Sequence, residues 1–210
     1  MLSSLREIIT ESEITLAEDP EERFITSGVG WDSYEALLAK LADRAHYRII
    51  YLDRVLEIVS PSIRHEKVKK NLAMLLEHFF YRQRINCIPR GSTTFRDREK
   101  QVGTEPDECY CLGVENNISD LAIEVNITSG SIDKLKTYGR LGIREVWLWK
   151  NNELSLYHLR QTTDRFSDSC GYEGIVTSEL LPELDIELLS RCALITNSLQ
   201  CLDEFDRSER

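Results

Sequence analysis

The sequence has no excess of positive charge. Its 26 Lys and Arg residues are outnumbered by 36 Asp and Glu residues, and the formal net charge is −10. Non-specific binding to nucleic acid depends on Lys and Arg side chains that neutralise phosphates, so the surface as a whole cannot serve that purpose. Any role on nucleic acid therefore needs a local basic patch or bound divalent cations, and charge alone favours a small-molecule or protein partner.

Long apolar runs and paired cysteine motifs are also missing. No stretch approaches the length of about 20 apolar residues that crosses a bilayer, and Met1 is not followed by a basic and apolar signal region. We therefore expect no membrane association and a cytoplasmic location. The six cysteines form no CxxC pair and no Cys/His spacing typical of a zinc site. We expect them to be small buried thiols without disulfides.

Proline and glycine are too few, at 5 and 10 residues, to form a linker in the middle of the chain. A length of 210 residues suits one domain with an appendage. Residues 1–30 are polar and acidic, and we expect an N-terminal extension there. Residues 31–184 are predicted to form the main domain, and residues 185–210 a C-terminal segment whose helix, at 185–204, packs on it.

The apolar residues alternate between the periods of strands and helices. Helices are predicted at 31–43, 64–84, 129–142 and 185–204. Strands are predicted at 47–52, 54–59, 107–112, 120–127, 144–149 and 154–159, with a further short strand and turn within 86–95. The first two strands should form a hairpin across Asp53 and Arg54. This order predicts an α/β fold with a mixed sheet flanked by helices.

Two acidic residues stand at the ends of two neighbouring strands. Asp107 opens the strand at 107–112, and Glu124 lies near the end of the strand at 120–127. Because the link between these strands is short, we expect antiparallel pairing, which brings both carboxylates to one edge of the sheet. Converging carboxylates suit a hard divalent cation such as Mg²⁺. The alternative is that each carboxylate is solvated or caps a turn, as is usual at strand ends.

Other residues can complete a site around this pair. Lys134 lies in the first turn of the helix after Glu124, where an ammonium can stabilise a developing negative charge, and Tyr138 shares its helix face. Glu57 alternates with apolar neighbours in a strand, so it points either into the same cleft or into solvent. His65 begins the helix at 64–84 and is either a site residue or a surface or capping residue.

Several motifs in order resemble one known family. They are "EIVSPSIRHEKV", "GSTTF", "EPDECY" and "DLAIEVNITSGSIDKLKTYGRLGIREVW", and together they cover roughly residues 30–160. They resemble the Uma2 family, which is common in cyanobacteria. The resemblance implies a restriction-endonuclease-like (PD-(D/E)xK) core. It also implies a metal-dependent endonuclease that hydrolyses phosphodiester bonds in DNA with Mg²⁺ or Mn²⁺.

The resemblance assigns catalytic roles to Glu57, His65, Asp107, Glu124 and Lys134. The aspartate of the family's "PD" is Asp107, preceded here by Pro106. Asp107 and Glu124 would be the metal ligands. Lys134 matches the family lysine that stands four residues before a tyrosine, here Tyr138, and it would stabilise charge or activate water.

One position departs from the simplest superfamily pattern. A lysine there stands two residues after the glutamate, whereas this chain has Asn126. Lys134 would then be the migrated lysine, with Asn126 and Tyr138 in supporting roles. Many Uma2-like sequences carry Asp at this position, so metal affinity should be weaker here. Asn126 and the acidic charge favour an alternative function: a catalytically degenerate nuclease-fold protein that binds a nucleic acid or a protein.

The aromatic and apolar content of two helices suggests self-association. Trp31, Tyr34 and the helix predicted at 185–204 carry more apolar surface than a small monomer needs to expose. We therefore expect a homodimer, supported by the N-terminal segment or by an exposed strand edge.

Overall fold

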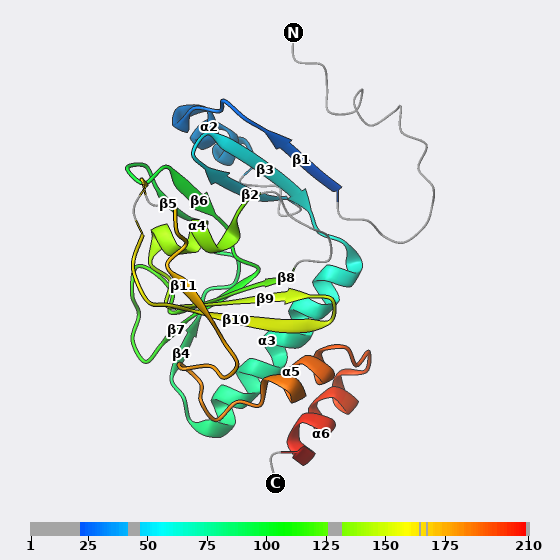
Figure 1. The fold of residues 1–210 in the computed structure, drawn as a ribbon. Helices are drawn as coiled ribbons and strands as arrows, with labels where there is room; N and C mark the ends of the chain where they lie inside the picture. The colour runs from blue at the N-terminus through cyan, green and yellow to red at the C-terminus, as the bar shows by residue number, and fades with distance from the viewer. Residues whose placement is uncertain (1–21, 42–46, 126–131, 164, 167, 209–210) are drawn as a thin grey trace.

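Two β-sheets lie one above the other, with one helix between them and further helices on their outer faces (Figure 1). The computed structural model describes residues 22–41, 47–125, 132–163, 165–166 and 168–208. Its helices are α2 (Trp31–Leu41), α3 (Ile63–Gln83), α4 (Lys134–Leu141), α5 (Ile186–Ala193) and α6 (Ser198–Ser208). From the top of Figure 1, the layers are α2, the upper sheet, α4, the lower sheet, and α3 with α5 and α6.

The upper sheet is antiparallel throughout. Its strands, in spatial order, are β1 (Glu22–Thr26), β3 (Val55–Ser60), β2 (Arg48–Leu52), β6 (Val102–Thr104) and β5 (Phe95–Asp97). Asp53 and Arg54 both adopt positive φ angles, 47° and 70°, between β2 and β3. Such two-residue turns match the twist of antiparallel strands, and the predicted hairpin is confirmed.

Helix α2 covers the outer face of the upper sheet. Alternation along β2 and β3 turns Ile49, Tyr51 and Leu56 to this face, where they pack against Trp31 and Tyr34. Trp31 is 6% exposed and Tyr34 is 0% exposed. The expectation that these two aromatics would be exposed was therefore wrong, because an amphipathic helix buries them on its own sheet. They offer no surface for a homodimer.

The lower sheet is mixed, as the sequence predicted. Its strands, in spatial order, are β11 (Tyr172–Ile175), β10 (Glu153–Leu159), β9 (Glu145–Lys150), β8 (Leu121–Val125), β7 (Glu108–Leu112) and β4 (Cys87–Pro89). β8 and β9 are parallel because α4 connects them by a crossover, and the other neighbours are antiparallel. Helix α4 begins after its cap Asp133 and ends at Gly142, whose φ of 82° suits glycine.

Helix α3 packs across the lower sheet and forms the main core. Leu72 and Phe79, both 0% exposed, belong to one apolar cluster with Ile123 and Trp147 of the sheet. Burial of each such side chain contributes about 1.5–3 kcal/mol. The ends of β7 and β8, which carry the predicted carboxylates, are therefore held on a well-packed platform.

The prediction of a single closing helix at 185–204 was wrong. The chain forms α5 and α6 instead, with a break between Ala193 and Ser198. Asn197 explains the break, because its side-chain oxygen accepts a hydrogen bond of 3.0 Å from the backbone N–H of Gln200. Asparagine favours such a cap over the interior of a helix.

Four strands, β1, β5, β6 and β11, were not predicted, and with them the second sheet was missed. Each has three to five residues, too few for an alternating pattern to stand out. β1 lies within residues 1–30, the predicted extension.

Leu188 and Leu189 of α5 join the apolar cluster under α3, which supports packing of the C-terminal segment on the main domain.

All six cysteines are free thiols, and four of them are buried. In the described part of the chain, no helix is both long enough and apolar enough to cross a membrane.

Candidate active site

Asp107 and Glu124 face each other across two paired strands. Glu108 pairs with Ile123, so Asp107, one residue before β7, stands opposite Glu124 of β8. The Cβ atoms of directly opposed residues are about 4.5–5.5 Å apart. Both residues are buried, with exposures of 2% and 3%, and both line a small cavity of about 20 Å³ between the two sheets. The register therefore brings the two carboxylates together, as the sequence predicted.

Asp107 is held by donors from three elements. Its Oδ2 atom accepts a hydrogen bond of 2.8 Å from the backbone N–H of Val125 and lies 3.1 Å from Nε2 of His65. Its Oδ1 atom lies 3.5 Å from Nε of Arg48. Burial by itself raises the pKa of Asp107, but His65, the Val125 N–H and the charge of Lys134 together hold it below its usual value. Asp107 is therefore an anion at neutral pH.

Glu124 is held from helix α4. Nζ of Lys134 lies 2.9 Å from its Oε1 atom, and the hydroxyl of Tyr138 donates to the same oxygen. Burial raises the pKa of Glu124, Lys134 opposes this rise, and repulsion from Asp107 adds to it. The result is a raised pKa. Burial and the nearby Glu124 also raise the pKa of Tyr138, which therefore keeps its proton and remains a donor.

His65 is buried beside Asp107, so the alternative of a surface residue was wrong. It is 4% exposed and lies in the first turn of α3, where its backbone N–H donates to Oγ of the cap Ser62. Its Nδ1 atom lies 3.5 Å from Oε1 of Glu66, on the side of the ring away from Asp107. The helix start thus aims an imidazole at the carboxylate cavity.

Glu57 is also buried, at 0% exposure, so it does not point into solvent. It forms an ion pair with Arg23 of β1 and accepts a hydrogen bond of 3.2 Å from the backbone N–H of Ile132. Arg23 lines the cavity, whereas Glu57 is not among the described residues that line it. Glu57 therefore holds a cation toward the carboxylates of Asp107 and Glu124.

Two arginines of this cavity were missed by the sequence analysis. Val59 pairs with Arg23 on one side and with Arg48 on the other, so the three form one row across the upper sheet. All three line the cavity. The only local signal was an arginine at or near the start of a short strand, and such residues are usually solvated. Their common row depends on the pairing of three strands that are distant in sequence.

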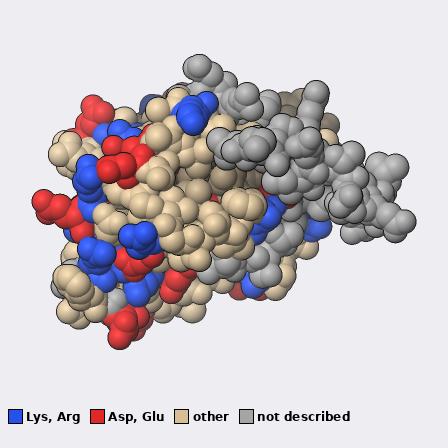
Figure 2. Space-filling model, turned by 90° about the horizontal axis from the view of Figure 1, so that it is seen from above, with Lys and Arg blue, Asp and Glu red and all other residues tan. Residues whose placement is uncertain are grey.

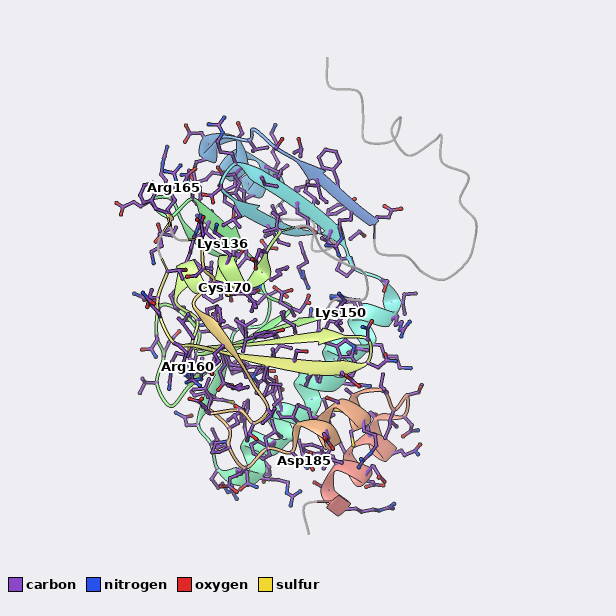
Figure 3. The ribbon with its side chains drawn as sticks, viewed as in Figure 1. Lys136, Lys150, Arg160, Arg165, Cys170 and Asp185 are labelled. Atoms are coloured by element: carbon purple, nitrogen blue, oxygen red, sulfur yellow. The ribbon has the colours of Figure 1, made fainter. Side chains whose placement is uncertain are left out.

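Helix α4 is itself anchored to the turn between β2 and β3. The guanidinium of Arg140, 0% exposed, donates to both carboxylate oxygens of Asp53. Hydrogen bonding from Arg140 lowers the pKa of Asp53 first, and the charges of Lys136 and Arg165 lower it further. Figure 3 labels Lys136 on α4 and Arg165 beyond it on the same side of the molecule. The charge of Lys136 therefore acts on Asp53 in the turn, whereas Lys134 forms an ion pair with Glu124.

Asn126, predicted to support the site, lies outside the described residues.

The donor set of the cavity fits Mg²⁺. No group of three or more His, Cys, Asp or Glu side chains is arranged for metal binding within the described residues. Mg²⁺ needs no such cage, because it is usually held by one or two carboxylates with waters and substrate phosphates. The contacts that the described residues make with Glu124 fall on Oε1. Asp107 and Glu124 are therefore the residues that would hold a cation.

A family model matches residues 31–189 of the chain. The family is Uma2, with the description "Putative restriction endonuclease". The match spans both sheets apart from β1, and it includes every residue of the cavity except Arg23. No curated protein matched the chain.

Proposed function

Because the chain belongs to the Uma2 family and so has a restriction-endonuclease-like fold, we propose that it is a metal-dependent endonuclease that hydrolyses phosphodiester bonds in DNA. One observation carries the proposal. Two buried carboxylates, Asp107 and Glu124, stand opposite each other in a cavity lined by Lys134, His65 and Arg48. Buried carboxylates need a nearby positive charge to offset their desolvation. A divalent cation supplies that charge and also promotes the hydrolysis of phosphodiester bonds.

Asp107 and Glu124 would hold Mg²⁺, or Mn²⁺ in its place. The bound cation supplies a Lewis acid that polarises a phosphoryl oxygen and lowers the pKa of a coordinated water. Asp107 is suited to this role because its lowered pKa keeps it anionic. Val125 and His65 fix its orientation before any cation arrives.

Lys134 and Tyr138 would act from α4. The ammonium of Lys134 lies 2.9 Å from Glu124. It can shift toward the phosphate oxygens and stabilise the negative charge that develops on them. Tyr138 keeps its hydrogen bond to Glu124 and so preserves the direction of that carboxylate. Arg48, 3.5 Å from Asp107, offers a second cation to a phosphate that enters the cavity. The ion pair with Glu57 positions Arg23, which also lines the cavity.

The distribution of charge supports local binding of DNA. In the view of Figure 2, Lys and Arg residues are interspersed with Asp and Glu residues toward the left and lower left, and the middle of that face consists mainly of other residues. A mixed surface of this kind cannot bind phosphates over a wide area. The groups proposed to attract the phosphate are therefore the cations that line the cavity, Arg23, Arg48 and Lys134.

One observation favours the alternative function, a degenerate nuclease fold that only binds a partner. Lys134 and His65 contact Glu124 and Asp107 and so place positive or proton-donating groups beside both carboxylates. A scaffold that had lost catalysis would be stable in this state, and Asn126 in place of an aspartate fits such a loss. Metal binding separates the two functions, because a degenerate scaffold has no need to bind Mg²⁺.

The test is cleavage with metal occupancy measured on the same sample. Purified protein that binds Mn²⁺ by titration calorimetry should nick or cut at least one of single-stranded, duplex and supercoiled DNA. Protein that binds Mn²⁺ but cleaves none of them would refute the endonuclease.

We further propose that residues 31–184 form the nuclease domain, with residues 185–210 packed on it.

We also propose that the protein is a homodimer. Phe24 and Ile25 on the edge strand β1 are 54% and 44% exposed. Exposed apolar side chains on an edge strand favour self-association, so these two residues support the proposed dimer. Sedimentation that gives only a 24.3 kDa species would refute the dimer.

A further inference from the structure

A large open cleft leads to the carboxylate cavity. Its volume is about 1130 Å³, and it lies between α2 and the first turns of α3. Arg48, Pro61 and Glu105 line both the cleft and the cavity. A chain that lies in the cleft can therefore place one of its groups beside Asp107.

The cations of this cleft are loosely paired. They are Arg48, Lys69, Lys70 and Arg96. Their ion pairs with carboxylates measure 3.5–3.9 Å, whereas charge-assisted hydrogen bonds are about 2.7–2.9 Å long. The ion pair of Arg140 with Asp53, by comparison, is 2.5 Å long. Phosphate oxygens can thus replace the partners of the cleft cations at little cost.

An exposed aromatic ring stands among these cations. Tyr47 is 36% exposed, lines the cleft and directly precedes Arg48. A cationic groove combined with an accessible aromatic ring is the arrangement that binds single-stranded nucleic acid, because every unpaired base can stack on such a ring. In a duplex, the base faces are covered by their neighbours and cannot stack on Tyr47.

We propose that this cleft binds a single-stranded DNA segment, with one base stacked on Tyr47 and the neighbouring phosphates held by Arg48 and by Lys70, whose side chain is 71% exposed. The proposal rests on the proposed function, since it identifies the form of DNA that reaches the carboxylates. The size of the cleft favours a few nucleotides, because pockets for single small ligands are typically about 300–1,000 Å³. Glu35, Glu66 and Glu105 also line the cleft and disfavour the two phosphate backbones of a duplex.

The test measures binding in EDTA, so that cleavage does not interfere. The full chain is titrated into a fluorescent oligonucleotide of about 12 nucleotides, within the usual range of site sizes, and into the same sequence as a hairpin duplex. The single strand should bind more tightly. Tyr47→Ala should weaken its binding about 5- to 150-fold, and Tyr47→Phe should retain it. The matched control is Tyr81→Ala, since Tyr81 is 69% exposed but lies at the far end of α3.

A second measurement does not depend on stacking. Replacing Lys70 by Gln should reduce the slope of log K against log salt by about 0.7, the value for one phosphate contact on a single strand. Lys67→Gln is the control, because Lys67 lies on the same helix but donates to Thr196, away from the cleft. A purely structural effect of Lys70 would change affinity without changing this slope.

The proposal is overturned if the duplex binds as tightly as the single strand, or if Tyr47→Ala behaves like Tyr81→Ala while both retain the wild-type circular dichroism. These results are separable from the proposed function. Single-strand binding that depends on Tyr47, without cleavage in Mg²⁺, would refute the endonuclease and leave the cleft in place. Cleavage of duplex DNA that Tyr47→Ala does not alter would refute the cleft and support the endonuclease.

Discussion

Arg140 and Asp53, 87 residues apart, form a bidentate ion pair in which the guanidinium is fully buried. The two N–H···O distances are 2.8 and 2.5 Å. Arg140 also donates to the backbone oxygens of Lys100 and Arg165. The pair ties α4, which carries Lys134, to the hairpin of the upper sheet, so the site depends on a contact at its far side.

Asp53→Asn should therefore destabilise the fold near pH 7 by about 1–3 kcal/mol, because it weakens two hydrogen bonds to a buried charge. The hydrogen bonds from Arg140 hold the pKa of Asp53 below the usual aspartate value of 3.8. A group whose folded-state pKa is depressed contributes stability above its unfolded pKa and loses it as the pH falls through the folded pKa. The difference between wild type and variant should thus shrink below pH 3.8, as measured by urea unfolding. Asp32→Asn is the control, since Asp32 pairs with Arg98 but is 86% exposed; equal effects of the two variants would contradict the prediction.

Asp107→Asn and Glu124→Gln should each abolish metal binding and cleavage while the protein still folds. Loss of an outer partner of a metal ligand costs about 10–100-fold in affinity, and loss of a ligand should cost more. Mn²⁺ titration and plasmid nicking measure the two effects. Glu153→Gln, an exposed change on β10, is the control. Nicking that survives both substitutions would instead indicate a contaminating nuclease.

Lys134→Met should lower turnover by about 100- to 1,000-fold, the scale for removal of one charge-stabilising donor. Mn²⁺ binding should remain, because both carboxylates do. Lys136→Met is the matched control on the same helix, since Lys136 lies near Asp53. Equal losses for the two variants would mean that α4 needs positive charge in general and that Lys134 has no specific role.

Gly139→Ala should destabilise the protein by about 1–3 kcal/mol through overpacking. A Cβ atom there would lie 2.3 Å from the backbone oxygen of Cys170 and 3.0 Å from Oγ1 of Thr163; Figure 3 shows Cys170 beside α4. Helix propensity alone predicts the opposite sign, a gain of about 1 kcal/mol. Thermal unfolding decides between them. Gly30→Ala is the control, because among the described residues no atom beyond its chain neighbours lies within 4 Å of its added Cβ.

The sequence by itself determined the elements whose information is local. The hairpin at Asp53 and Arg54, helix α3 and the placement of Asp107 opposite Glu124 all follow from turn residues, apolar periods and a short connection. Adjacent strands with a short link have few ways to pair. The pairing of these carboxylates could therefore be predicted without knowledge of the rest of the fold.

Only the tertiary structure decided what surrounds that pair. Arg23 and Arg48 reach the cavity, and Glu57 pairs with Arg23, because three strands of a second sheet pair in one register. The loose ion pairs of the cleft depend on the approach of α2 and α3. A short strand carries too few residues to reveal which face it buries, and the partner of a charged side chain depends on segments far away in the sequence. Burial of the whole chain therefore selects the partners that local patterns leave open.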